Sequence, residues 1–80
     1  MMITPAQFRA ARALLGLSQE EVAAQAHVSK RTVVSLERGR PTLNATENAV
    51  MMALIEAGVL FTPAMTGEGP GVRFARDPEA

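Results

Sequence analysis

The chain has 80 residues, of which 48% are hydrophobic, and it contains no cysteine. This length allows one domain with a small core, which excludes an enzyme whose cleft lies deep in a large core. The hydrophobic content excludes a disordered chain, and the longest apolar run, Ala49–Ile55, is far shorter than the roughly 20 residues of a membrane span. The absence of cysteine excludes disulfides and thiolate metal sites. Because the N-terminus lacks the pattern of a secretory signal, we expect a cytoplasmic protein with no membrane partner.

The charge of the chain is unevenly distributed. Eight Lys and Arg residues balance eight Asp and Glu residues, so the net charge of zero gives no support to nucleic-acid binding. Exposed charges act over about 10 Å at ordinary salt, so a partner responds to the nearest face rather than to the total. The segment from His27 to Asn44 contains one acidic residue, Glu37, against four basic ones: Lys30, Arg31, Arg38 and Arg40.

The first predicted helix has a clear start and a clear end. Thr4 suits the N-cap, Pro5 the first helical position, and Gln7 is placed to complete a capping box. Gly16 suits the left-handed residue that follows a helix. The helix is therefore predicted from Pro5 to about Leu15.

The second and third predicted helices begin in the same way. Ser18 is the N-cap of the second helix with Glu21 as its capping-box partner, and Ser29 is the N-cap of the third. Gly39 is the expected stop of the third helix. These signals predict starts near Gln19 and Lys30 and, for the third helix, an end near Arg38.

The connection between these two helices, Ala26–Ser29, is short enough to force a sharp crossing. Such a crossing needs a small residue where the helices touch, which Ala23 supplies. Apolar residues that lock the pair are also present: Val22, Val28, Val33 and Leu36. Histidine tolerates positive φ better than most residues, so we interpret His27 as a turn residue and not as a metal ligand or catalytic base. The pattern is that of a helix-turn-helix.

The third helix is two-sided. At 100° per residue, one side carries Ser29, Val33, Leu36 and Glu37, and the opposite side carries Arg31, Val34, Ser35 and Arg38. Lys30 and Arg31 lie at the positive end of the helix dipole, where each costs about 0.3–1 kcal/mol relative to an acid. An anionic partner such as DNA would offset that cost. From these residues alone, a solvated basic surface is an equal alternative.

A fourth helix is predicted to open at Asn44 with Glu47 and to end at Gly58. Beyond it, the β-prone runs Val59–Thr62 and Val72–Ala75 flank a segment rich in glycine and proline, which favours a β-hairpin over an irregular tail. We expect one domain: residues 1–62 form the helical part, residues 59–75 its hairpin extension, and residues 76–80 a flexible tail.

Four parts of the chain together carry a family pattern: Arg12, Gly16–Ala23, Val28–Thr32 and Leu36–Arg40. With them, the run from about Phe8 to Leu54 resembles the Cro/cI-type helix-turn-helix family of bacterial and phage regulators, also called the XRE family. The resemblance implies a mainly α, lambda-repressor-like domain of four helices, here with a short C-terminal hairpin. His27 departs from it, since the family most often has glycine in the turn.

In this family the third helix enters the major groove of double-stranded DNA, and its first residues and those a turn later contact base edges. On this chain the base contacts would be Lys30, Arg31, Val34 and Ser35. The resemblance also implies an ion pair of Arg12 with Glu37 beneath the domain. Phosphate contacts would come from the start of the second helix and from the segment after the third: Ser18, Gln19, Arg38, Arg40 and Thr42.

The family usually acts as a dimer on a near-palindromic operator, so we expect a homodimer. The fourth helix is apolar around most of its circumference, more than one core face requires. The dimer candidates are Met51, Met52, Ile55, Leu60, Phe61 and Phe74. We expect a repressor without cofactor, metal or catalytic residues. The alternative is a module that binds a protein partner, as an antitoxin or anti-activator does.

Overall fold

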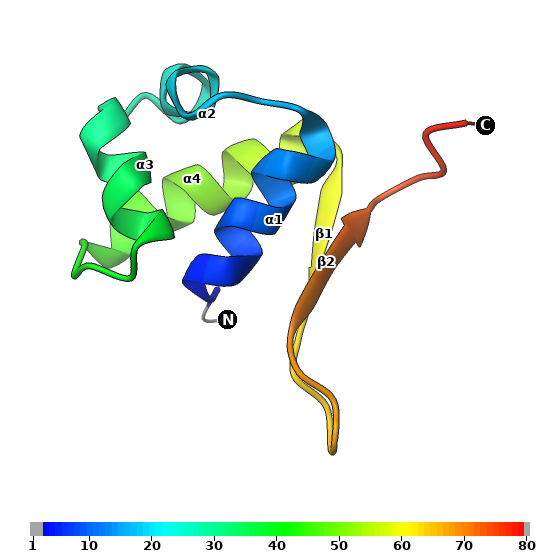
Figure 1. Ribbon diagram of the computed structural model, residues 1–80. Coiled ribbons are helices and arrows are strands. Elements are labelled where there is room, and N and C mark those ends of the chain that lie inside the picture. Colours follow the sequence, from blue (N-terminus) through cyan, green and yellow to red (C-terminus); the bar gives the residue numbers. More distant parts are fainter. Residues whose placement is uncertain (1–2, 80) are drawn as a thin grey trace.

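The computed structural model describes residues 3–79, and Met1, Met2 and Ala80 lie outside this range. The described chain forms four helices followed by a two-stranded antiparallel hairpin: α1 (Pro5–Leu15), α2 (Gln19–Ala26), α3 (Lys30–Glu37), α4 (Asn44–Ala57), β1 (Val59–Thr62) and β2 (Gly71–Phe74). The predicted mainly α fold of four helices with a short C-terminal hairpin is confirmed. Helices α2 and α3 lie at one end of the domain, and the hairpin lies on the other side of α1 (Figure 1).

The first three helices begin at the predicted side-chain caps. Thr4, Ser18 and Ser29 each accept a hydrogen bond from the backbone N–H three residues ahead, and Gln7 and Glu21 complete capping boxes at the first two. These bonds satisfy N–H groups that the first turn of a helix leaves free.

The same three helices end with a left-handed residue. Gly16, His27 and Gly39 have φ of 68°, 57° and 73°, and His27 is the one non-glycine residue with positive φ in the described range. After each, the next backbone N–H donates to a carbonyl five residues back, as Val28 does to Ala23 at 3.0 Å. The interpretation of His27 as a turn residue of positive φ is confirmed.

Helix α4 begins at Asn44, as predicted, but without a side-chain cap. Asn44 is already its first helical residue, and Leu43 occupies the N-cap position without a side-chain hydrogen bond. The backbone N–H of Glu47 donates to the Leu43 carbonyl at 3.0 Å. The predicted opening at Asn44 is therefore confirmed, and backbone bonding alone begins the helix. The helix ends before Gly58, as predicted.

The hairpin is confirmed, and the irregular-tail alternative is wrong. Val59 lies opposite Phe74, and Thr62 lies opposite Gly71. The second strand starts one residue earlier than predicted because Gly71 pairs with Thr62. Residues 76–79 lie exposed after the hairpin, and their flexibility stays a prediction, as does that of Ala80 outside the described range.

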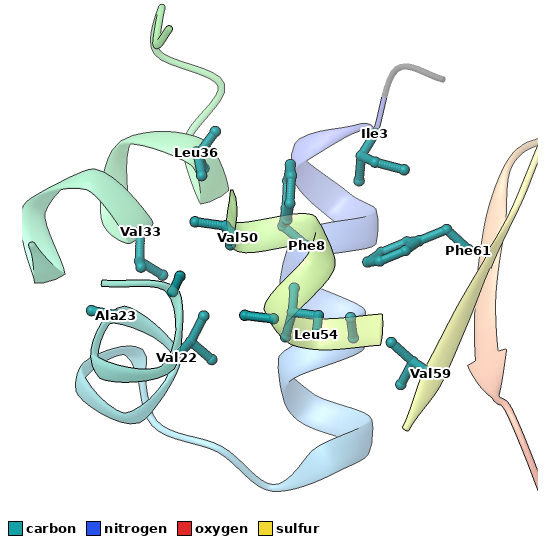
Figure 2. Packing of buried hydrophobic residues seen from close by; sticks show 13 residues of the cluster. Ile3, Phe8, Val22, Ala23, Val33, Leu36, Val50, Leu54, Val59 and Phe61 are labelled. Carbon is teal, nitrogen blue, oxygen red and sulfur yellow. The ribbon is translucent and has the colours of Figure 1, made fainter. Parts of the chain in front are cut away.

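The core lies between α1, α2, α3 and α4 and extends to the hairpin. Phe8, Val22, Val33, Val50 and Leu54 point toward one another from the four helices (Figure 2). The ring of Phe61 enters this core from β1 and packs against that of Phe8 in a T-shaped arrangement, with ring centroids 6.2 Å apart. An aromatic pair of this kind adds about 0.5–1.5 kcal/mol to the free energy gained by burial.

Gln7 fastens the hairpin to the first helix. Its buried Nε2 donates to the carbonyl of Gly71 at 2.8 Å and to that of Thr62 at 3.3 Å, while its Oε1 accepts from the N–H of Thr4 at 2.8 Å. One side chain therefore completes the cap of α1 and holds both strands of the hairpin. The sequence prediction includes the first role and misses the second.

Candidate nucleic-acid interface

The α2–turn–α3 unit places one face of α3 away from the core. Val33, Leu36 and Glu37 are buried, whereas Lys30 and Arg31 are exposed at the start of the helix. Arg38 is exposed directly after its last residue. The outward face is therefore basic, as the 100° periodicity predicts.

Three residues of α3 and its cap differ in exposure from the simple two-sided prediction. Ser29 is assigned by periodicity to the core side but is exposed, because it precedes the helix and its side chain accepts from the Thr32 N–H at 3.2 Å. Val34 and Ser35, on the outward side, are half-buried. All four candidate base-contact residues, Lys30, Arg31, Val34 and Ser35, nevertheless come from one helix and retain accessible surface.

The candidate phosphate contacts come from chain segments before and after α3. Ser18 and Gln19 stand at the start of α2, where Ser18 exchanges capping bonds with Glu21 at 2.9 and 3.0 Å. Gln19 is half-buried and its Nε2 donates to Oε1 of Glu37 at 3.2 Å. After α3 come the remaining three: Arg38 and Arg40 are exposed and Thr42 is half-buried.

A buried carboxylate ties the unit to α1. The guanidinium of Arg12 donates from Nε to Oε2 of Glu37 at 2.7 Å and from Nη2 to Oε1 at 2.9 Å. The Glu37 side chain is 6% exposed and that of Arg12 is 27% exposed. Burial by itself would raise the pKa of Glu37, but the hydrogen bonds from Arg12 and Gln19 outweigh it and hold that pKa below its ordinary value. The bond to Glu37 likewise raises the pKa of Arg12.

Arg9 is a further residue of this network that the sequence analysis misses. Its Nη1 donates to the backbone carbonyl of Glu37, at the end of α3. A guanidinium there satisfies a carbonyl that the helix leaves free and complements the negative end of the helix dipole. The basic residue one turn before Arg12 is the signal that could have suggested it. Arg9 and Arg12 together hold the C-terminal end of α3.

A second ion pair joins the starts of α2 and α3, and the sequence analysis does not foresee it. Nζ of Lys30 lies 2.7 Å from Oε1 of Glu20, with the two side chains 55% and 63% exposed. The hydrogen bond from Lys30 lowers the pKa of Glu20. One of the four candidate base-contact residues is therefore paired with an acid at the surface.

The candidate dimer residues differ in their exposure. The prediction of Phe61 as a dimer contact is wrong. Its side chain is 8% exposed, because alternate residues of β1 face opposite sides and its ring belongs to the core. Met52 and Leu60 are exposed, and the other three candidates, Met51, Ile55 and Phe74, are half-buried. Met52 on α4 and Leu60 on β1 are thus the most accessible of the set.

Among residues 3–79, no three His, Cys, Asp or Glu side chains are grouped so that they could hold a metal ion. None of the helices in that range has the length and apolar character needed to cross a membrane. Comparison with known proteins finds that residues 8–47, half of the chain, match the sequence model of the helix-turn-helix family. No curated protein was found to match the chain.

Proposed function

Since the chain belongs to the Cro/cI-type (XRE) helix-turn-helix family of DNA-binding regulators, we propose that it is a sequence-specific repressor acting as a homodimer on a near-palindromic operator. The observation that carries this proposal is the outward face of α3, where Lys30, Arg31 and Arg38 are exposed while the opposite face is buried. In this family such a helix enters the major groove. Access to promoter DNA implies action in the cytoplasm.

The side chains of this face suit the base edges of the major groove. The guanidinium of Arg31 can donate two hydrogen bonds to O6 and N7 of a guanine, and the methyl groups of Val34 suit the thymine methyl. Ser35, one residue further on, has a hydroxyl that can donate or accept. These residue types support a readout of sequence and not of charge alone.

Phosphate contacts on either side would orient the helix without reading sequence. Gln19 uses one Nε2 hydrogen for Glu37, which leaves its second hydrogen for a phosphate oxygen. Arg38 and Arg40 are exposed beyond α3 and can approach the backbone from the other end. The basic residues therefore have two proposed tasks: Arg31 contacts a base edge, and Arg38 and Arg40 contact phosphates.

Two copies are needed because a single unit of this size makes few contacts. Half-sites on one face of the duplex lie about 34 Å apart, so a dimer must present its two α3 helices at that spacing. Met52 and Leu60, exposed at 46% and 39%, are the proposed dimer contacts on α4 and β1. Burial of such side chains between two copies is favourable because it removes apolar surface from water.

The test is a titration of the full chain onto a duplex containing its own upstream region and onto a shuffled duplex, at several salt concentrations. The proposal expects tighter binding to the first duplex and affinity for both that falls as salt rises. Selection from random DNA is the second measurement. Equal affinity for the two duplexes, together with no sequence enriched by that selection, contradicts sequence-specific repression. The net charge of zero favours, as the second candidate, a module that acts on a protein partner. Absence of DNA binding at low salt supports that alternative.

A further inference from the structure

The surface that would meet DNA carries an acidic group beside its first base-contact residue. Oε1 of Glu20 lies 2.7 Å from Nζ of Lys30, and both side chains are more than half exposed. Glu20 follows Gln19, a candidate phosphate contact, at the start of α2. The pair therefore stands where a phosphate and a base edge would both be within reach.

The pair changes what Lys30 attracts. An unpaired lysine ammonium binds any duplex through phosphate, because that contact depends on charge and not on sequence. With Glu20 at hydrogen-bond distance, the pair has no net charge, and its carboxylate repels a phosphate oxygen. A nearby phosphate would thus have to displace an anion that is already in place.

A guanine edge does not meet this obstacle. Its O6 and N7 are neutral acceptors, so they do not repel the carboxylate of Glu20 as a phosphate does. The ammonium of Lys30 has three N–H donors. One of them can stay with Glu20 while the other two reach the base. The ion pair therefore favours a neutral acceptor in the groove over an anionic acceptor on the backbone.

We propose that Glu20 is a specificity-determining residue, which pairs with Lys30 so that this lysine contributes to operator recognition but little to non-operator binding. The proposal rests on the DNA-binding function proposed above. Glu20 acts through Lys30 and makes no base contact of its own. The net charge of zero agrees with a protein whose general attraction to DNA is kept low.

The test compares Glu20→Gln with Glu21→Gln as its matched control. The two residues are neighbours on α2, and both changes remove one negative charge. A glutamine at position 21 can still accept the capping bond from the Ser18 N–H. The probes are a duplex of about 30 base pairs selected from random DNA by the wild-type chain, long enough for two half-sites, and a shuffled duplex of equal composition.

Glu20→Gln is expected to raise affinity for the shuffled duplex about two- to fivefold and to steepen the salt dependence of that binding by about 0.9, the value for one added phosphate contact. Affinity for the selected duplex should rise less, so the ratio of the two affinities falls. Glu21→Gln should change both affinities alike and keep the ratio. In a Lys30→Ala background, Glu20→Gln should no longer lower the ratio.

Two results would overturn the proposed role of Glu20 and leave the proposed DNA-binding function standing. One is a wild-type chain that discriminates between the duplexes while Glu20→Gln keeps the same ratio. The other is a fall in the ratio that persists in the Lys30→Ala background. Failure of the wild-type chain to enrich any sequence from random DNA, or to bind a duplex at all, refutes the DNA-binding function and this inference together, so the two failures are distinguishable. Thermal unfolding of each variant shows whether the fold is retained.

Discussion

Replacing Glu37 by alanine removes the acceptor on which three helices converge. The change deletes two hydrogen bonds from Arg12, at 2.7 and 2.9 Å, and one from Gln19 at 3.2 Å. It leaves the bond from Arg9 to the backbone carbonyl of residue 37 in place. Because α3 keeps that support at its C-terminal end, the variant measures what the Glu37 carboxylate contributes to stability, separately from the anchoring of the helix by Arg9.

The size of the effect follows from the burial of the two partners. Breaking a fully buried ion pair costs about 3–5 kcal/mol, and an exposed pair contributes about 0–1 kcal/mol. Glu37 is 6% exposed, but Arg12 is 27% exposed and keeps a bond to the Leu17 carbonyl at 3.3 Å. Since the orphaned guanidinium can still reach water, we expect a loss of about 2–3 kcal/mol in the free energy of unfolding.

The assay is thermal unfolding followed by circular dichroism, with urea unfolding as a second measurement. For a domain of this size, a loss of 2–3 kcal/mol lowers Tm by about 10–20 °C. Glu20→Ala is the matched control, because it breaks an ion pair of the same 2.7 Å length at the surface. It should lower Tm much less. A fall of under about 4 °C for Glu37→Ala would refute the reasoning, because an exposed pair could account for it.

Four further outcomes are expected. Arg31→Ala should relax the preference at one base pair by about 1–3 kcal/mol, whereas Arg40→Ala should weaken binding to all sequences alike; equal losses on every duplex for Arg31→Ala would contradict its role as a base contact. Because the pKa of Glu37 is lowered in the folded protein, its contribution to stability is fully present above the unfolded-state pKa of about 4.3 and is lost as the pH falls through the folded-state value. Unfolding free energy measured against pH should therefore fall in acid more steeply for the wild type than for Glu37→Gln, and parallel curves would oppose this assignment. Gln7→Ala should lower the free energy of unfolding by about 2–3 kcal/mol, because the carbonyls of half-buried Thr62 and Gly71 lose the donor of a buried side chain; amide hydrogen exchange should then quicken in the hairpin more than in α3, and uniform exchange would argue against the role of Gln7 in holding the hairpin. His27→Gly should raise stability by up to about 1 kcal/mol, since glycine adopts the left-handed conformation without strain, and a lower Tm would count against strain at this turn.

The features that the sequence determined by itself depend on neighbours in the chain. Thr4, Ser18 and Ser29 cap backbone groups three residues ahead, and Gly16 and Gly39 end helices through their own φ. Such signals need no knowledge of the rest of the fold. The basic outward face of α3 was predictable for the same reason, because the helical period alone places its residues.

Tertiary structure decided which residues from distant parts of the chain meet. Alternation in β1 could place either Leu60 or Phe61 in the core, and packing against Phe8 selects Phe61. The second role of Gln7 depends on a hairpin more than fifty residues away. The pairing of Glu20 with Lys30 requires the crossing of α2 and α3 that brings their first turns together. Composition and periodicity describe each element alone, whereas these contacts exist only once the elements have packed.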